Sequence, residues 1–159
     1  LPGIRWLHDR TPPAGQVSAR PQRWPAGLDE IEANFAAFFV AIEPQGDEEV
    51  IVGMAGIQPV HGAEPDLMGV PVPEELIVNA PTVRLEAVRV APERQRRGIG
   101  RALTRIAIQW AEVHGFERML LDTTSEQEAA IALYESEGFR RIGTSEFGRW
   151  QIVWMALDM

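Results

Sequence analysis

The clearest hydrophobic pattern in the chain is helical and covers residues 99–113, where apolar side chains recur every three or four positions. Gly115 follows this segment, and glycine is the usual residue just past the end of a helix. The pattern therefore predicts an amphipathic helix whose apolar face carries Ile99, Leu103, Ile106, Ala107, Trp110 and Val113.

Shorter apolar runs before and after this helix predict strands. The run 35–42 has the composition of a buried strand, and the turn residues 44–47 join it to a partner strand in a hairpin. Residues 82–90 alternate between apolar and polar side chains up to Pro92, which ends the strand. The predicted strands are 35–42, 50–60, 82–90, 118–122 and 151–157, the last of them apolar on both faces.

A second helix is predicted after the fourth of these strands. Ser125 and Glu128 have the spacing of a capping box, which would open the helix. Gly138 would end the helix, with Phe139 placed to pack back against it.

The remaining segments are less regular. Residues 29–35 fit a short helix, whereas the prolines between residues 61 and 81 favour an irregular loop. The order hairpin, strand, helix, strand, helix, strand predicts an α/β (α+β) fold. A chain of 159 residues suits one domain, so we expect residues 1–159 to share a single core.

Composition excludes several classes of protein. The absence of cysteine excludes disulfides, thiolate zinc sites and a cysteine nucleophile. His8, His61 and His114 are far apart in the sequence and lack metal-ligand spacing, so we expect no metal. No apolar run approaches the ~18 residues of a membrane span, and the first residues lack the layout of a signal peptide. We therefore expect a cytoplasmic protein that does not bind membranes.

Charge is unevenly distributed along the chain, whose net charge is -8. Residues 84–105 contain seven arginines and two carboxylates, whereas eleven carboxylates and no basic residue lie between Arg23 and Arg84. One basic segment in an acidic protein favours a local anion site. Nucleic-acid binding is disfavoured, because residues 84–105 contain no aromatic side chain that could stack on bases.

The junction between the predicted strand 82–90 and the helix 99–113 reads Gln95-Arg96-Arg97-Gly98-Ile99-Gly100. Its glycines leave backbone amides unshielded, and the first amides of a helix lack partners and attract anions. A pyrophosphate suits this arrangement. The Gly-Lys-Ser/Thr signature of a nucleotide P-loop is absent, and the glycine spacing differs from the dinucleotide-binding fingerprint.

About thirty residues later the chain reads Ala130-Ile131-Ala132-Leu133-Tyr134-Glu135-Ser136-Glu137-Gly138-Phe139. Together with the strand 85–90, the Pro92 turn and the Gln-x-x-Gly-x-Gly loop, this segment resembles the GNAT superfamily of acetyl-CoA-dependent N-acyltransferases. The resemblance is specific over residues 82–143, looser over the hairpin and the final strand, and absent from residues 1–27. The superfamily most often has Asn at position 127, where this chain has Gln127.

The resemblance implies one GNAT-like domain with a central mixed sheet, mostly antiparallel and flanked by helices, that splays between two central strands. The backbone of Val88 and Val90 would hold the pantetheine arm of acetyl-CoA, and a Val88 amide would polarise the acetyl carbonyl. Amides of residues 96–101 would hold the pyrophosphate. The implied cofactor-binding residues are Val88, Arg89, Val90, Gln95, Arg96, Arg97, Gly98, Ile99, Gly100, Arg101 and Gln127.

The resemblance also implies catalytic roles. Tyr134, the single tyrosine of the chain, would protonate the departing CoA thiolate, which suits a phenol with a pKa of about 10. A carboxylate or a water chain would accept the proton of the attacking amine, and Asp122 and Glu86 are the two candidate carboxylates. A purely structural role is the alternative for each residue: packing for Tyr134, helix N-terminal charge for Asp122, and an ion pair with Arg84 for Glu86.

These observations predict an acetyl-CoA-dependent N-acetyltransferase that acts by direct transfer in a ternary complex. The acidic stretch before Arg84 favours a small cationic amine or a peptide N-terminus as acceptor, although solvated surface charge explains it almost as well. The alternative is a CoA-binding regulatory module without turnover, against which the presence of Tyr134 argues. Trp150 and Trp154, on one face of the last strand, indicate core packing or a homodimer contact.

Overall fold

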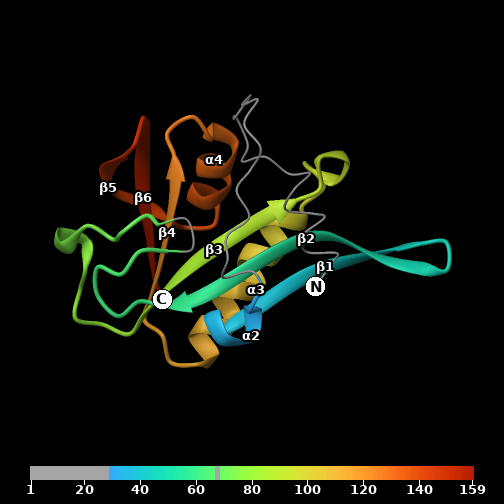
Figure 1. The fold of residues 1–159 in the computed structure, drawn as a ribbon, viewed down its shortest axis with the longest axis horizontal. Helices are drawn as coiled ribbons and strands as arrows, with labels where there is room; N and C mark the ends of the chain where they lie inside the picture. Colours follow the sequence, from blue (N-terminus) through green and yellow to red (C-terminus); the bar gives the residue numbers. More distant parts are fainter. Residues whose placement is uncertain (1–28, 67–68) are drawn as a thin grey trace.

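A computed structural model describes residues 29–66 and 69–159, and its central feature is a six-stranded sheet (Figure 1). The strand order is β1-β2-β3-β4-β6-β5, and every neighbouring pair is antiparallel except β3 and β4, which are parallel. This mixed, mostly antiparallel sheet confirms the predicted fold class. The strands are β1 (Ala37–Gln45), β2 (Glu48–Pro59), β3 (Thr82–Val90), β4 (Arg118–Thr124), β5 (Arg140–Phe147) and β6 (Trp150–Asp158).

Two helices cover one face of this sheet. The amphipathic helix α3 (Ile99–Val113) lies where the hydrophobic pattern predicts it and packs against β1, β2 and β3. The shorter helix α4 (Glu128–Ser136) lies beside β4 (Figure 1). Buried side chains of both helices join one core cluster with the sheet, among them Leu103, Ala107, Ile131 and Tyr134. The short elements are the helix α2 (Ile31–Asn34) and the 3-10 turns η2 (Glu74–Leu76) and η3 (Pro92–Arg94).

The segment between β2 and β3 covers part of the opposite face. It is irregular, as predicted, and its described part contains η2 and one isolated bridge between Pro65 and Pro71. Val70 and Val72 of this segment are buried in a cluster with Leu120 and Trp154. The fully buried Trp154 is therefore a core residue on this face of the sheet.

The two central strands diverge. β3 and β4 are paired only from Thr82 to Arg84 on β3 and from Arg118 to Leu120 on β4. Beyond these residues the strands separate, and Figure 1 shows them diverging towards α4. The opening between β3 and β4 past Arg84 is the expected splay.

A bulge in β3 interrupts its pairing with β2. Glu86 pairs with Gly56, whereas Arg89 pairs with Met54, so β3 has one more residue than β2 between these two positions. Ala87 lies in the bulge and has a φ of 54°, a value in the left-handed region that a non-glycine residue seldom adopts.

This bulge changes the direction in which the backbone of β3 points. The carbonyl of Thr82 and the amide of Ala91 both form hydrogen bonds with the β2 side. In a regular strand, the backbone N–H and C=O groups of residues an odd number of positions apart point to opposite edges of the strand. Thr82 and Ala91 are nine positions apart, yet both point towards β2, because the extra residue of the bulge reverses the direction once. The backbone groups of Val88 and Val90 consequently point away from β2 and into the splay.

Two predictions about strands are wrong. The sequence predicts a buried strand over residues 35–42, whereas β1 is an edge strand with Ile42 52% exposed, because β1 has a neighbour on one side only. The sequence predicts no strand over residues 140–147, yet β5 spans them. β5 is the other edge of the sheet and carries no buried side chain, so its sequence lacks the apolar alternation of a half-buried strand.

The predicted capping box of α4 is also wrong. α4 begins after Gln127, and no side chain caps its first turn. Ser125 lies in a separate turn, where its amide donates a hydrogen bond to β6 across 2.9 Å. The end of α4 is as predicted: Gly138 has a φ of 96°, and Phe139 is buried against Tyr134.

Candidate active site

The β3 side of the splay presents backbone groups rather than charged side chains. Val88 and Val90 direct their amides and carbonyls into it, and the carbonyl of Val90 accepts a hydrogen bond from Gln95 Nε2 at 3.1 Å. Within the described ranges, β3 has no strand partner on this side after Arg84. An extended chain that carries amides can therefore pair with this edge as an additional strand.

The loop between β3 and α3 brings the predicted anion-binding residues together. Gly98 precedes α3 with a φ of 84°, and Arg96 has a φ of 61°. No side chain caps the first turn of α3, and the side chains of Arg96 and Arg97 are exposed at the same loop. Unshielded amides, the helix dipole and two guanidinium groups make this loop suitable for a pyrophosphate.

The side chain of Arg101, one of the predicted anion-binding residues, forms an ion pair away from the loop. Arg101 forms a hydrogen bond and ion pair with Glu137, which follows α4, and Arg105 binds the same carboxylate at 2.7 Å. Both guanidiniums lower the pKa of Glu137. These two ion pairs link α3 to the end of α4. Because the guanidinium of Arg101 is bound to Glu137, its backbone amide is the group that remains suited to an anion in the loop.

Tyr134 projects from α4 and is 8% exposed. Its ring packs edge-on against Phe139, with 5.8 Å between the centroids. Burial raises the pKa of Tyr134 to about 12, and the nearby positive charge of Arg89 opposes this shift. The phenol therefore keeps its proton at neutral pH and can act as an acid. Gln127, before α4, accepts a hydrogen bond from the Thr123 hydroxyl at 2.8 Å through its side-chain oxygen.

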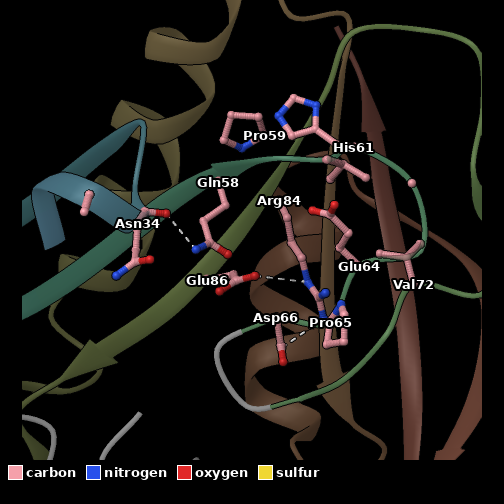
Figure 2. A pocket seen from close by; sticks show the side chains of 13 residues that line it. Asn34, Gln58, Pro59, His61, Glu64, Pro65, Asp66, Val72, Arg84 and Glu86 are labelled. Carbon is pink, nitrogen blue, oxygen red and sulfur yellow. Dashed lines mark hydrogen bonds and ion pairs between the residues drawn. The ribbon is translucent and has the colours of Figure 1, made fainter. Parts of the chain in front are cut away.

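A pocket opens on the face of the sheet opposite α3. On β3, Val83 and Leu85 belong to the core cluster under α3, whereas the alternate residues Arg84 and Glu86 face the other way into the pocket. Figure 2 shows Arg84 between the carboxylates of Glu86 and Asp66. The pocket has a volume of about 250 Å³. Its lining also includes Asn34, Gln58, Pro59, Val60, His61, Glu64, Pro65 and Val72.

Arg84 is the centre of a buried ion network. Its Nη2 lies 2.5 Å from Asp122 Oδ1 and 3.0 Å from Asp66 Oδ2, and its Nε lies 3.5 Å from Glu86 Oε1. Its Nη1 donates to the carbonyl of Val70 at 3.0 Å, and the guanidinium lies over the Trp154 ring, 4.8 Å from the centroid. Only 3% of the Arg84 side chain is exposed. One guanidinium thus holds β3, β4 and the segment 60–81 together.

The two candidate bases both contact Arg84 but differ in their access to the pocket. Asp122 accepts hydrogen bonds from Nε and Nη2 of Arg84 and does not line the pocket. Burial raises its pKa, against the opposing effect of Arg84. Glu86 lines the pocket and lies farther from the guanidinium. The geometry therefore favours Glu86 as the carboxylate that meets a ligand.

Arg89 lies in the bulged part of β3, and its side chain is largely buried. Its Nε is buried and has no hydrogen-bond partner within residues 29–66 and 69–159. Its Nη1 lies 3.4 Å from the carbonyl of Val88. Burial lowers the pKa of Arg89, and Tyr134 opposes this shift only when its phenol is ionised.

Sequence reasoning did not find several residues of the pocket. The sequence gives no signal for Asn34 or Gln58, and Glu64 and Asp66 stand out in it only as members of an acidic stretch. No motif marks these positions. His61, which the sequence placed in the proline-rich segment, does line the pocket.

The described part of the chain has neither a metal site nor a membrane-spanning helix. No group of three or more histidine and carboxylate side chains there is arranged to hold a metal ion. None of the helices in those same ranges is both long enough and apolar enough to cross a lipid bilayer.

Comparisons with known proteins agree on one family. A family model described as "Acetyltransferase (GNAT) family" matches residues 2–139. N-acetyltransferase family 8 member 3 of Rattus norvegicus is 33% identical over 113 residues, which are 71% of this chain and 42% of that protein. The chain thus spans about two fifths of the length of this curated relative.

Solved structures agree with this result. The ribosomal-protein-alanine N-acetyltransferase of Brucella melitensis is 26% identical with a TM-score of 0.56, over 77% of this chain and 68% of that chain. A chain of the NatC complex, whose crystal structure contains Gag peptide and CoA, is 17% identical with a TM-score of 0.70. That match covers 99% of this chain and 89% of that chain, and at this identity it shows the fold alone.

Proposed function

The chain belongs to the GNAT acetyltransferase family, and we propose that it transfers the acetyl group of acetyl-CoA to a primary amine by direct attack in a ternary complex. One observation carries this proposal. The splay between β3 and β4, with an anion-binding loop at the end of β3, lies beside a pocket on the other face that contains several carboxylates. Two substrates can therefore approach the same point from different sides.

Acetyl-CoA, the co-substrate of this family, supplies an activated acetyl thioester when bound. The residues present suit it: the backbone of Val88 and Val90 would pair with the pantetheine amides, and the amides around Gly98 would hold the pyrophosphate. The amide of Val88 would also donate a hydrogen bond to the acetyl carbonyl and stabilise the negative charge that develops there.

The acceptor would bind in the pocket lined by Arg84 and Glu86. Among the described residues that line this pocket, Glu64, Asp66 and Glu86 carry carboxylates and Arg84 carries a guanidinium, so the charge of these side chains sums to a negative value. Negative charge favours an acceptor that arrives as an ammonium ion, either a small cationic amine or a peptide N-terminus. Glu86 would accept a proton from that ammonium, directly or through a water molecule, before the amine attacks. Asp122, held by Arg84, is the second candidate for this role.

Tyr134 would donate its proton to the departing thiolate. With a pKa of about 12 it stays protonated through the neutral range, as a general acid must. Its position in the core cluster shared by α3 and α4 fixes the ring relative to the splay.

The test measures release of CoA from acetyl-CoA with polyamines, aminoglycosides, amino acids and short peptides as acceptors. We expect turnover with one acceptor class, and a fall in kcat of roughly 100-fold or more for Tyr134→Phe with acetyl-CoA binding retained. Glu135→Gln, at the exposed next position of α4, is the matched control and should keep full activity. Tight acetyl-CoA binding without turnover on any acceptor would instead support a CoA-binding regulatory module.

A further inference from the structure

The side chain of Arg89 lies on the acceptor face of the sheet. Val88 packs against the core cluster under α3, and Val90 approaches Gly100 at the start of that helix. Ala91, by contrast, is buried with Met54 in a cluster on the opposite face. Because side chains alternate along a strand, Arg89 shares the face of Ala91. The acidic pocket opens on this same face, although Arg89 itself does not line it.

The described residues satisfy the guanidinium of Arg89 only in part. Its Nε is buried, and no acceptor lies within hydrogen-bond distance in the described residues. The contact of Nη1 with the Val88 carbonyl, at 3.4 Å, is long for a hydrogen bond. None of the described carboxylates lies within salt-bridge distance of it. A largely buried guanidinium with an unpartnered Nε and no counter-charge among the described residues is unfavourable, which points to an anion that arrives with a ligand.

The co-substrate does not supply this anion. The pantetheine arm and the acetyl thioester, which would lie along Val88 and Val90, are uncharged. The phosphates of acetyl-CoA would bind at the loop around Gly98, at the start of α3. The anion near Arg89 therefore belongs to the acceptor.

We propose that Arg89 binds a carboxylate of the acceptor, and that the acceptor is a free amino acid whose reacting amine is next to that carboxylate. The proposal rests on the N-acetyltransferase function above. An amine that attacks an acetyl group held by the Val88 amide would lie one residue from Arg89. Because one carbon separates the amine from the carboxylate in an α-amino acid, the carboxylate would then lie near the Arg89 guanidinium. The planar guanidinium matches a carboxylate with two parallel hydrogen bonds.

The acidic pocket then selects the rest of the acceptor. Glu64, Asp66 and Glu86 favour a second positive charge on the side chain of the amino acid. Lysine and arginine combine this charge with an α-carboxylate. The decarboxylated amines of the two, 1,5-diaminopentane and agmatine, keep the positive charges and lack the carboxylate.

The experiment compares L-lysine with 1,5-diaminopentane, and L-arginine with agmatine, as acceptors for the wild-type chain and Arg89→Met. The readout is the ratio of kcat/KM within each pair, which cancels any general effect of the substitution on folding or on the co-substrate. We expect the wild type to prefer the amino acid and Arg89→Met to lower that ratio by about tenfold to a hundredfold. Arg89→Lys should recover part of the preference. Arg141→Met, at an exposed arginine that pairs with Glu135, should leave the ratio unchanged.

Two results would overturn the assignment. If Arg89→Met lowered kcat/KM equally for an amino acid and its decarboxylated amine, Arg89 would act on the acetyl transfer that both acceptors share and not on the carboxylate. If the substitution instead weakened the affinity for acetyl-CoA, Arg89 would be a cofactor-binding residue. If no acceptor is turned over by the wild type, the proposed function fails, and calorimetry with Nα-acetyl-L-lysine and the CoA-bound protein tests Arg89 separately. Arg89→Met should weaken that affinity at least tenfold, and unchanged affinity would contradict the proposal.

Discussion

Arg84 and Arg89 lie on the same strand and on the same face of the sheet, and both are buried to a large extent, yet their surroundings differ. Arg84 has Asp66, Glu86 and Asp122 within salt-bridge distance. Although burial acts against it, these carboxylates raise the pKa of Arg84. Burial lowers the pKa of Arg89, and no carboxylate of the described residues lies within salt-bridge distance of it.

This difference separates a structural charge from a functional one. The partners of Arg84 come from three segments of the chain, so its ion pairs fix the fold around the pocket. The described residues leave Arg89 Nε without a partner, so this guanidinium adds little to the fold and is available to a ligand. Substitution of the two arginines should therefore produce opposite patterns of lost stability and lost activity.

The largest expected effect is the loss of stability in Arg84→Met. Removal of the guanidinium takes the positive charge of Arg84 away from three largely buried carboxylates, those of Asp66, Glu86 and Asp122, and breaking such a network typically costs about 3–5 kcal/mol. Urea unfolding at neutral pH, followed by tryptophan fluorescence, measures this change. Arg84→Lys keeps the charge but loses the fork of donors, so it should lie between the wild type and Arg84→Met. A loss below about 1 kcal/mol would remove the contrast with Arg89.

An intermediate effect is expected for Asp122→Asn, and it should depend on pH. The substitution keeps an acceptor for Arg84 but removes both the charge that attracts Arg84 and the charge that burial disfavours, so these effects oppose each other and the change at neutral pH should stay below about 2 kcal/mol. The pKa of Asp122 is raised in the folded state, so the folded protein binds this proton more tightly than the unfolded chain. The wild type should therefore gain stability relative to Asp122→Asn as the pH falls through that raised pKa towards the unfolded value.

Unfolding of both proteins by urea across this acidic range checks the sign. If the wild type instead lost stability relative to Asp122→Asn on acidification, the charge of Arg84 would outweigh the burial of Asp122. Asp122 would then resemble an ordinary ion-paired carboxylate, with its pKa lowered.

The sequence predicted the elements that carry the cofactor chemistry because local patterns determine them. The bounds of β3 and α3 follow from alternation and helical spacing, and the glycines of the loop between them mark a backbone conformation that few other residues adopt. The end of α4 at Gly138 is another local signal. β5 was missed because an edge strand with no buried side chain has no periodic apolar signal.

The acceptor side could not be predicted in the same way. Asp66 and Asp122 meet at Arg84 only because β4 and the segment 60–81 fold onto the same face of β3, and nothing in their sequence spacing encodes this. The position of Arg89 depends on the bulge at Ala87, and strict alternation from Arg84 would place its side chain on the other face. Such long-range contacts and irregular backbone are visible only in the folded chain.

The smallest effect on stability is expected for Arg89→Met. The substitution removes a buried, poorly partnered cation and keeps an unbranched side chain that can fill its volume, so the desolvation of the guanidinium is relieved. The free energy of unfolding should change by less than about 1 kcal/mol, or increase, while the preference for amino acids over their decarboxylated amines is lost. The same urea experiment as for Arg84→Met provides the direct comparison. A loss of more than about 2 kcal/mol would mean that Arg89 supports the fold as Arg84 does, and its orphaned Nε would then be no evidence for a ligand.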